Sequence, residues 1–264
     1  MSQRIQFART GGSDVLELAD VTPAEPGQGE VRITNKAVGL NFIDIYVRTG
    51  LYPAPSMPSG LGTEGAGVVD AVGAGVTHLN VGDRVAYAQG PLGAYACQWA
   101  KSLGVKLIGT VSSQEKADLA MANGAWATIN YSEESVVERV RELTNGEMCD
   151  VVYDSVGKDT WEMSLDCLKT RGLMVSFGNA SGPVEGVNIG ILNQKGSLFV
   201  TRPSLNGYAD TRERLEMMSN DFFSMLESGK IKIDIANRYP LAEAGKAQDA
   251  VQSRKTTGST ILLP

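Results

Sequence analysis

The sequence predicts an α/β fold in which a β-rich part precedes a doubly wound parallel sheet. In roughly the first 90 residues, short segments alternate apolar and polar side chains, which is typical of half-buried strands. From about Ala94 onward, short apolar segments alternate with amphipathic segments of helical length. After Pro203 a long amphipathic helix is expected, with Leu215, Met218, Phe222 and Met225 on its inner face, and the pattern then returns to strand. We therefore expect three segments, at residues 1–95, 96–203 and 204–264.

The first segment contains four expected strands. Residues 30–34 alternate strictly between polar and apolar side chains, and residues 15–18 follow a similar pattern from Leu16 onward. Residues 65–73 form a glycine-rich apolar segment, and residues 80–88 read as a turn followed by a strand. Proline and glycine punctuate residues 50–62, which we expect to be an irregular loop.

The second segment alternates helices with strands. Residues 94–103 suit a helix that ends at Gly104, and Ser112 or Ser113 can cap the next helix. Such alternation favours a parallel sheet covered by helices on both faces. Further strands are expected at 106–111, 128–131, 150–154, 173–177 and 197–201, and further helices at 132–143 and 161–168.

Composition excludes several function classes. The formal net charge of −6 disfavours nucleic acid or an anionic membrane as the main partner, because both require clustered cations. No apolar run reaches the roughly 20 residues that span a bilayer, and no signal-peptide pattern is present. A cytoplasmic location is expected. Three separated cysteines and the single His78 suit neither a zinc site, a disulfide framework nor a Ser-His-Asp triad.

Several motifs resemble one enzyme family from end to end. The segments that begin at Asn41 (Asn-Phe-Ile-Asp-Ile-Tyr), Gly60 (Gly-Leu-Gly-Thr-Glu-Gly-Ala-Gly) and Arg171 (Arg-Gly-Leu-Met-Val-Ser-Phe-Gly-Asn) are similar to the bacterial zinc-free NADPH:quinone oxidoreductases. These belong to the zeta-crystallin-like branch of the medium-chain dehydrogenase/reductase superfamily. The resemblance implies a GroES-like catalytic domain, a Rossmann domain, a homodimer and hydride transfer from NADPH to a quinone.

The resemblance also implies site residues. Lys116 and Arg254 would bind the adenosine 2′-phosphate through charge-assisted hydrogen bonds. A site that prefers NAD would carry an acidic residue at the end of the second strand, but residues 110–113 (Thr-Val-Ser-Ser) contain none. Zinc-dependent relatives carry Cys where Asn41 stands and His where Thr63 stands, so no metal is expected. The implied catalytic residues are Asn41, Tyr46 and Tyr52; the implied cofactor-binding residues are Asn41, Phe42, Ile43, Asp44, Ser112, Ser113, Lys116, Tyr131, Ser155, Phe177, Gly178, Asn179, Val200, Thr201, Arg202 and Arg254.

The phosphate-binding glycine loop of a dinucleotide fold is missing. The family's loop resembles Ala-Ala-Gly-Gly-Val-Gly, and no such string occurs in this chain. Compared with the family, about 60 residues are absent near Tyr95–Ala96, so both domains are expected to be partial. The absent piece would include the first, central strand of the order 3-2-1-4-5-6. Strands 2 and 4 would then be unpaired or forced together.

Three alternatives stay open. Residues 84–88, the turn at 89–93 and the helix at 94–103 could imitate the missing strand, loop and helix, although Pro91 removes one amide donor. The same zinc-free fold could reduce enones or aldehydes. The chain could also be a non-catalytic module that dimerises through the apolar strand at Ser197–Thr201.

Overall fold

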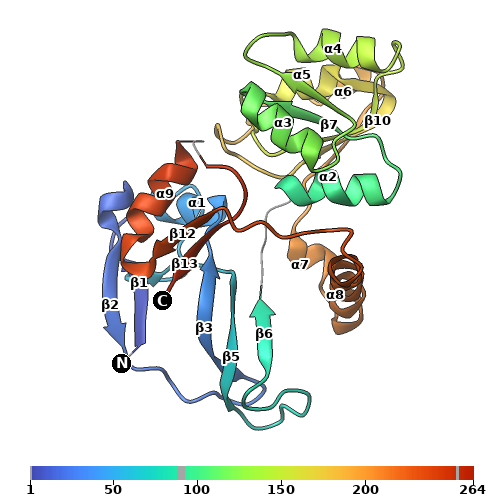
Figure 1. The fold of residues 1–264 in the computed structure, drawn as a ribbon. Coiled ribbons are helices and arrows are strands. Elements are labelled where there is room, and N and C mark those ends of the chain that lie inside the picture. Colours follow the sequence, from blue (N-terminus) through green and yellow to red (C-terminus); the bar gives the residue numbers. More distant parts are fainter. Residues whose placement is uncertain (1, 88–92, 254–255) are drawn as a thin grey trace. The chain divides into compact units, whose positions relative to one another are not determined.

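The chain folds into two compact units. The computed structural model describes residues 2–87, 93–253 and 256–264 (Figure 1). Unit 1 consists of the N-terminal part up to Gly93 together with the C-terminal part from Ile233 onward, and unit 2 consists of Ala94–Lys232. The first unit is β-rich and the second alternates helices and strands, so the expected α/β class is confirmed.

Unit 1 contains two sheets. One has three strands in the order β2-β1-β4, and the other has five strands in the order β12-β13-β3-β5-β6. The C-terminal strand β13 pairs with β3, which ties the end of the chain to the N-terminal part. The elements of unit 1 are β1 (Ser2–Phe7), η1 (Ser13–Val15), β2 (Glu17–Val21), β3 (Val31–Gly39), α1 (Phe42–Thr49), β4 (Ser59–Gly60), β5 (Gly65–Val72), β6 (Arg84–Tyr87), β12 (Asn237–Pro240), η2 (Leu241–Glu243), α9 (Ala244–Gln252) and β13 (Thr260–Leu263).

Strand β6 rules out one of the alternatives drawn from the sequence. It pairs antiparallel with β5, with Tyr87 opposite Gly65 and Arg84 opposite Val68. It therefore belongs to the antiparallel sheet of unit 1 and cannot serve as the first strand of a parallel nucleotide sheet. The proposed imitation of the glycine loop is wrong on this point, and residues 88–92 of that loop lie outside the described residues.

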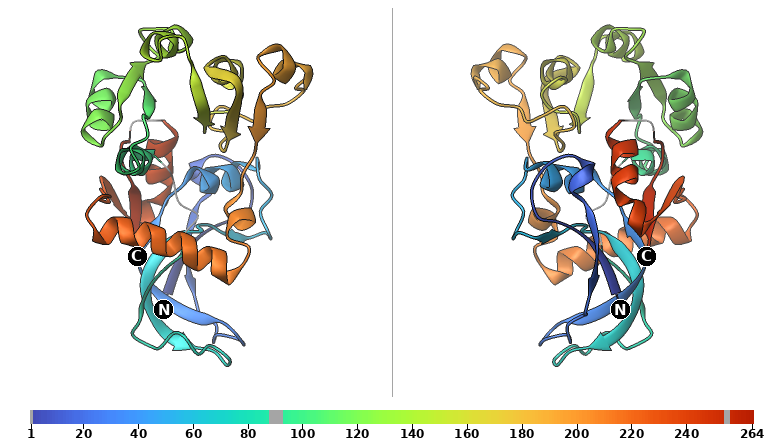
Figure 2. Two further views of the ribbon diagram at one scale, coloured as in Figure 1. Left: turned by 90° about the vertical axis from the view of Figure 1, so that its right-hand side faces the viewer. Right: turned by 90° about the vertical axis from the view of Figure 1, so that its left-hand side faces the viewer.

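Unit 2 carries a parallel sheet in two separate pieces (Figure 2). One piece pairs β7 with β8, and the other has the order β11-β10-β9. Relative to the order 3-2-1-4-5-6, these pieces correspond to strands 3-2 and 4-5-6, with the first strand absent between them. The elements are α2 (Gly93–Ser102), β7 (Ile108–Val111), α3 (Gln114–Ala122), β8 (Ala127–Asn130), α4 (Val136–Leu143), β9 (Cys149–Asp154), α5 (Trp161–Asp166), β10 (Leu168–Ser176), α6 (Gly190–Gln194), β11 (Phe199–Thr201), α7 (Leu205–Tyr208) and α8 (Arg212–Glu227).

Helix α4 packs against both pieces of this sheet. Val136 and Val140 of α4 form one buried cluster with Ile129 of β8. Ile108 of β7 and Cys149 of β9 pack against the same cluster. The two pieces therefore share a hydrophobic core on the α4 face, although no backbone pairing joins them within the described part of the chain.

The segment after Pro203 differs from expectation, because residues 204–232 group with unit 2. The Phe222 ring of α8 stacks on the Trp99 ring of α2, with centroids 6.4 Å apart. The Gln98 side chain of α2 accepts a hydrogen bond from the Lys232 backbone N–H at 2.7 Å. These contacts hold α8 beside α2, so the return to unit 1 begins at Ile233 and not at residue 204.

Candidate functional site

One group of candidate residues lies at the start of helix α1 in unit 1. Asn41 precedes the helix in extended backbone conformation, and its backbone N–H donates to Asp44 Oδ2 at 2.8 Å. The carboxylate of Asp44 therefore caps the helix and fixes the entry of the chain. Asn41 and Asp44 are both buried, whereas Phe42 and Ile43, in the first turn, are half-buried.

Glu64 completes this arrangement and was not among the residues expected from the sequence. The Asn41 side-chain amide donates from Nδ2 to Glu64 Oε2 at 2.7 Å, which fixes the orientation of the amide. The pKa of Asp44 is raised to about 6, mainly by burial; the hydrogen bond from Asn41 opposes this rise and the nearby Glu64 charge adds to it. Glu64 follows Thr63 in the glycine-rich motif, so its position beside Asn41 required the fold to be known.

Two tyrosines form an aromatic wall at the other end of α1. The rings of Tyr46 and Tyr52 meet edge to face, with centroids 5.3 Å apart, and Phe42 lies 6.1 Å from Tyr46. The Tyr52 backbone N–H donates to the Tyr46 carbonyl at 3.0 Å, which folds the chain back after Gly50. All three predicted substrate-side residues, Asn41, Tyr46 and Tyr52, thus come from one helix and its flanks.

The Asn41 side chain contacts a carboxylate, that of Glu64. The thiolate and imidazole ligands that zinc prefers are scarce in unit 1, because it has no cysteine and His78 is its only histidine. The described residues contain no group of three or more His, Cys, Asp or Glu side chains placed to bind a metal. The three cysteines belong to unit 2, where burial raises the pKa of each thiol.

A cavity of about 670 Å³ lies elsewhere in unit 1. Residues of β1 and β3 line it, together with Leu40, Asp44 and Tyr87. The Asn35 side chain donates from Nδ2 to the Tyr87 hydroxyl at 2.9 Å, and its buried Oδ1 has no hydrogen-bond partner among the described residues. This cavity is not lined by Asn41, Tyr46 or Tyr52, so we do not assign the substrate to it.

A separate group of candidate residues lies in unit 2, at the carboxyl ends of β7 and β8. Val111 pairs with Asn130, which places Ser112 and Tyr131 side by side where the two strands end. Ser113 caps α3, and its hydroxyl accepts from the Lys116 backbone N–H at 3.4 Å. The sequence-based group Ser112, Ser113, Lys116 and Tyr131 is thus brought together at one helix start, whereas Arg254 lies outside the described residues.

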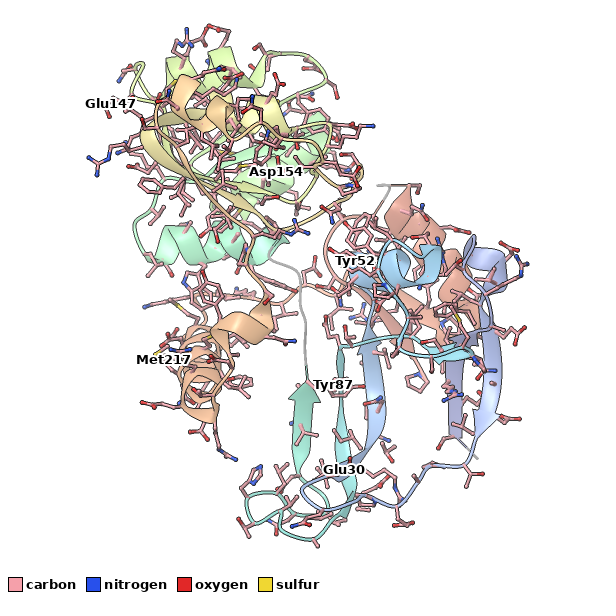
Figure 3. All side chains as sticks on the ribbon, turned by 180° about the vertical axis from the view of Figure 1, so that it is seen from behind. Glu30, Tyr52, Tyr87, Glu147, Asp154 and Met217 are labelled. Carbon is pink, nitrogen blue, oxygen red and sulfur yellow. The ribbon has the colours of Figure 1, made fainter. Side chains whose placement is uncertain are left out.

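Asp154 organises the turn at the carboxyl end of β9 (Figure 3). Its Oδ1 accepts from the backbone N–H groups of Val156 and Gly157 at 2.7 and 2.9 Å. Its Oδ2 accepts from the hydroxyls of Thr160 and Ser164, both at 2.6 Å. Asp154 is only 4% exposed, so these bonds fix the loop on which Ser155 stands.

The loop after β10 packs closely on this turn. A Cβ atom at Gly178 would lie 2.1 Å from the Ser155 carbonyl oxygen, so only glycine fits there. Arg202, which follows β11, donates to the Gly178 carbonyl at 3.0 Å. Seven of the predicted cofactor-binding residues therefore gather at the carboxyl ends of β9, β10 and β11: Ser155, Phe177, Gly178, Asn179, Val200, Thr201 and Arg202.

Two groups of predicted cofactor-binding residues therefore lie in unit 2, each at the carboxyl ends of parallel strands. Ligands of open α/β sheets bind at such ends. The part between them, where a glycine loop would hold a pyrophosphate, corresponds to the gap between β7 and β9. Within the described ranges, no helix is long and apolar enough to cross a membrane.

Comparison with known proteins agrees with this architecture. The "Alcohol dehydrogenase GroES-like domain" family model matches residues 27–142, and the "Zinc-binding dehydrogenase" model matches residues 91–220. A Pseudomonas aeruginosa quinone oxidoreductase is 54% identical over 325 aligned positions that cover 100% of both chains. A 2-haloacrylate reductase from a Burkholderia species is 35% identical, over 97% of each chain.

A solved structure gives the same result. The crystal structure of Escherichia coli quinone oxidoreductase, described as a complex with NADPH, superposes with a TM-score of 0.97 at 48% identity and covers 100% of both chains. Because the P. aeruginosa alignment spans 325 positions and this chain has 264 residues, about 60 positions of the relative have no counterpart here. The chain belongs to the quinone oxidoreductase family of the medium-chain dehydrogenase/reductase superfamily.

Proposed function

We propose that this chain is an NADPH-dependent quinone oxidoreductase. The observation that carries the proposal is the clustering of the site residues at strand ends: Ser112, Ser113, Lys116 and Tyr131 at β7 and β8, and Phe177 to Asn179 with Arg202 at β9 to β11. The first group suits a 2′-phosphate, because hydroxyls and a cation surround a helix start. The relatives named as quinone oxidoreductases, including one described with NADPH, support the same cofactor and acceptor.

The chain's own residues would position and enclose the reactants. NADPH, when bound, supplies a hydride to the quinone, and water can protonate the quinone oxygen. Tyr46 and Tyr52 offer a flat aromatic wall for the acceptor ring, and the Asn41 amide is held in one orientation by Glu64. Such positioning and exclusion of water account for most of what this reaction requires. We further propose that no metal takes part, because unit 1 has no cysteine and a single histidine, His78, so the thiolate and imidazole ligands of a zinc site are not available as a set.

The 2′-phosphate site can be tested without the pyrophosphate cradle. The probe is adenosine 2′,5′-bisphosphate, with adenosine 5′-monophosphate as the reference, and binding is measured by isothermal titration calorimetry. We expect the bisphosphate to bind more tightly, and Lys116→Ala to weaken its binding about 10- to 100-fold through loss of a charge-assisted contact.

Lys106→Ala is the matched control for this test. It removes the same charge from the amino end of β7, where the Lys106 ammonium lies 4.8 Å from the Trp126 ring centre. The control variant should bind the bisphosphate as the parent chain does. Equal affinities for the two nucleotides, or equal losses in both variants, would reject the 2′-phosphate assignment.

The acceptor is tested by following NADPH oxidation at 340 nm with 1,4-benzoquinone. We expect quinone-dependent oxidation that saturates only at high NADPH concentration, because the described residues provide no glycine loop for the pyrophosphate. The resemblance to a 2-haloacrylate reductase favours a second candidate, reduction of an activated carbon–carbon double bond, so 2-chloroacrylate is the comparison substrate. Bisphosphate binding without turnover of either acceptor would favour the non-catalytic module.

We also propose a homodimer formed through the segment Ser197–Thr201. Strand β11 lies at the outer edge of its sheet, and its Phe199 and Val200 side chains are exposed by 57% and 38%. An apolar edge strand of this kind favours pairing with a second copy. Light scattering after size-exclusion chromatography should give twice the chain mass, and Phe199→Lys should give the monomer mass.

A cytoplasmic location stays a prediction.

A further inference from the structure

The strands β7 and β9 each have one edge without a partner among the described residues. β7 pairs only with β8, and β9 pairs only with β10. An unpaired edge presents a row of backbone N–H and C=O groups that can bond to another strand. We call the space between these two edges the strand slot.

The side-chain directions show that the slot lies between β7 and β9, and not beyond β8. Gly109 and Thr128 face helix α3, because Ala120 Cβ would lie 3.9 Å from a Cβ atom at Gly109. Ile108 and Ile129 have the opposite direction and pack in the α4 cluster. Helices α3 and α4 therefore cover opposite faces, and right-handed crossovers then place β9 on the β7 side of the pair.

Next to the slot, β9 exposes large apolar side chains, of which Tyr153 meets only the edge of the Phe177 ring among the described aromatic contacts. Val151 and Tyr153 of β9 are exposed by 40% and 67%, although β9 is the middle strand of the family's sheet order. Val152, which points to the other face, packs against the α4 cluster. One face of the slot is thus closed by a helix while the other face exposes β-branched and aromatic groups, as expected where a central strand is absent.

The order of elements indicates what would fill the slot. Helices α3, α4, α5 and α6 each follow a strand of unit 2, whereas α2 follows β6, which belongs to the sheet of unit 1. The relatives carry about 60 more residues than this chain. A strand that precedes α2 in this alternation would be parallel to β7 and β9, and buried on both faces.

We infer that the strand slot binds an extended apolar polypeptide strand in trans, and that the strand within the segment present in the relatives and absent here is its occupant. Four residues of β7 and six of β9 provide the two edges, so a strand of this length can pair on both sides at once. The inference concerns backbone pairing and requires no quinone reduction by the chain alone.

The test uses one defined probe. A recombinant peptide is made from the residues of the P. aeruginosa relative that align with no residue of this chain. Hydrogen exchange with mass spectrometry then follows the full-length chain with and without the peptide. We expect exchange to slow at least tenfold in both 108–111 and 149–154, while residues 199–201 of the outer edge strand are unchanged.

Matched variants separate pairing in the slot from general association. Val151→Asp places a charge beside the inserted strand and should weaken peptide binding at least tenfold. Phe199→Asp makes the same kind of change on the exposed side of β11, in the same half-sheet, and should leave peptide binding unchanged. A peptide with proline at alternate positions of its strand lacks the required amides and should not bind.

Several outcomes would overturn the inference. These are no slowing of exchange at saturating peptide, slowing confined to residues 199–201, or equal weakening by Val151→Asp and Phe199→Asp. Slowing at 108–111 and 149–154 that grows with protein concentration, before peptide is added, would identify a second copy of the chain as the occupant instead. All of these measurements omit NADPH and quinone, so failure of the proposed activity would be recorded separately.

Discussion

At the scale of single residues, Asp44 combines a structural role with an unfavourable charge. Its carboxylate accepts from the Asn41 backbone N–H, yet only 4% of the residue is exposed. Burial therefore raises its pKa from 3.8 to about 6 despite that bond. The helix that carries the predicted substrate-side residues thus begins at a group whose ionisation opposes folding at neutral pH.

This raised pKa makes the stability of unit 1 dependent on pH. The folded state binds the proton of Asp44 more tightly than the unfolded state, so its favourable contribution is complete below about pH 4. That contribution is lost as the pH rises through about 6. Asp44→Asn keeps an acceptor but has no charge, so it should raise the free energy of unfolding at pH 7.5 by up to about 3 kcal/mol, and much less at pH 4.

Urea denaturation of both proteins at the two pH values measures this difference. Asp70→Asn provides a control of opposite sign, because hydrogen bonds from Thr34 and Arg32 lower the pKa of Asp70. The stabilisation that the Asp70 carboxylate provides is lost as the pH falls through its pKa. Asp70→Asn should therefore lower the free energy of unfolding more at pH 7.5 than at pH 4. A pH-independent effect of Asp44→Asn would show that its charge does not matter.

Asp154 holds the turn at the carboxyl end of β9 in unit 2, on which the loop after β10 packs. Asp154→Ala leaves the Val156 and Gly157 amides and two hydroxyls without their acceptor. The free energy of unfolding should fall by about 3 kcal/mol, because these donors are buried or partly buried. Asp150→Ala on the same strand removes an exposed ion pair to Lys169 and should change the free energy of unfolding far less. Equal effects in a urea titration would contradict this role.

At the scale of elements, α1 is held in place by the C-terminal helix α9. The Arg48 guanidinium, only 1% exposed, donates to Gln248 Oε1 at 2.9 Å and to Gln252 Oε1 at 3.0 Å. Burial lowers the pKa of Arg48, and the charges of Asp249 and Asp14 partly oppose this effect. A residue from the start of the chain is thus bonded to the segment that returns at its end.

Replacing this arginine should loosen α1 from α9. Arg48→Met keeps much of the apolar stem but leaves the buried Gln248 amide unsatisfied, so the free energy of unfolding should fall by about 1–3 kcal/mol. Arg4→Met removes an exposed guanidinium that bonds only Gln6 on its own strand, and should change stability by about 0.5 kcal/mol or less. Thermal unfolding of the two variants and the parent makes the comparison; similar midpoints for both variants would argue against the anchor.

The elements predicted from sequence are those set by local pattern. Periodicity and capping residues marked helices such as α3, where Ser113 caps the chain, and glycine-flanked apolar runs marked β7 to β10. The absent central strand was predicted because the family's strand order fixes which edges lose a partner. Non-local facts were not predictable: Glu64 binds the Asn41 amide across 23 positions, and residues 204–232 stay with unit 2 through Trp99 and Phe222.

The buried face expected for helix α8 was also wrong, for a physical reason. The apolar spacing after Pro203 suggested a buried stripe that includes Leu215, yet Leu215 is 52% exposed and α8 has no fully buried residue. Only the part of the helix near Phe222 and Met225 meets α2. Periodicity identifies an apolar face, but it cannot state whether a neighbouring element is present to cover it.

At the scale of the whole molecule, the chain contains separate hydrophobic cores. The core of unit 1 is built from Ile5, Leu40, Ala244, Ala247 and Leu262, and thus from both ends of the chain. Unit 2 has two clusters, one around α4 and the other around α5 and β10, and its parallel sheet lacks the strand that would join its two pieces. The missing strand therefore weakens unit 2, while unit 1 keeps β13 paired with β3.

Two cores of different completeness should unfold in two steps. All three tryptophans, Trp99, Trp126 and Trp161, belong to unit 2, so their fluorescence reports that unit, whereas far-ultraviolet circular dichroism reports both. We expect the fluorescence transition in urea to come first, because unit 2 has unpaired strand edges. Asp154→Ala should move the fluorescence midpoint to lower urea, and Arg48→Met should move only the later part of the dichroism curve. If each variant shifts both transitions together, the molecule unfolds as one cooperative body and the two units do not hold separate stabilities.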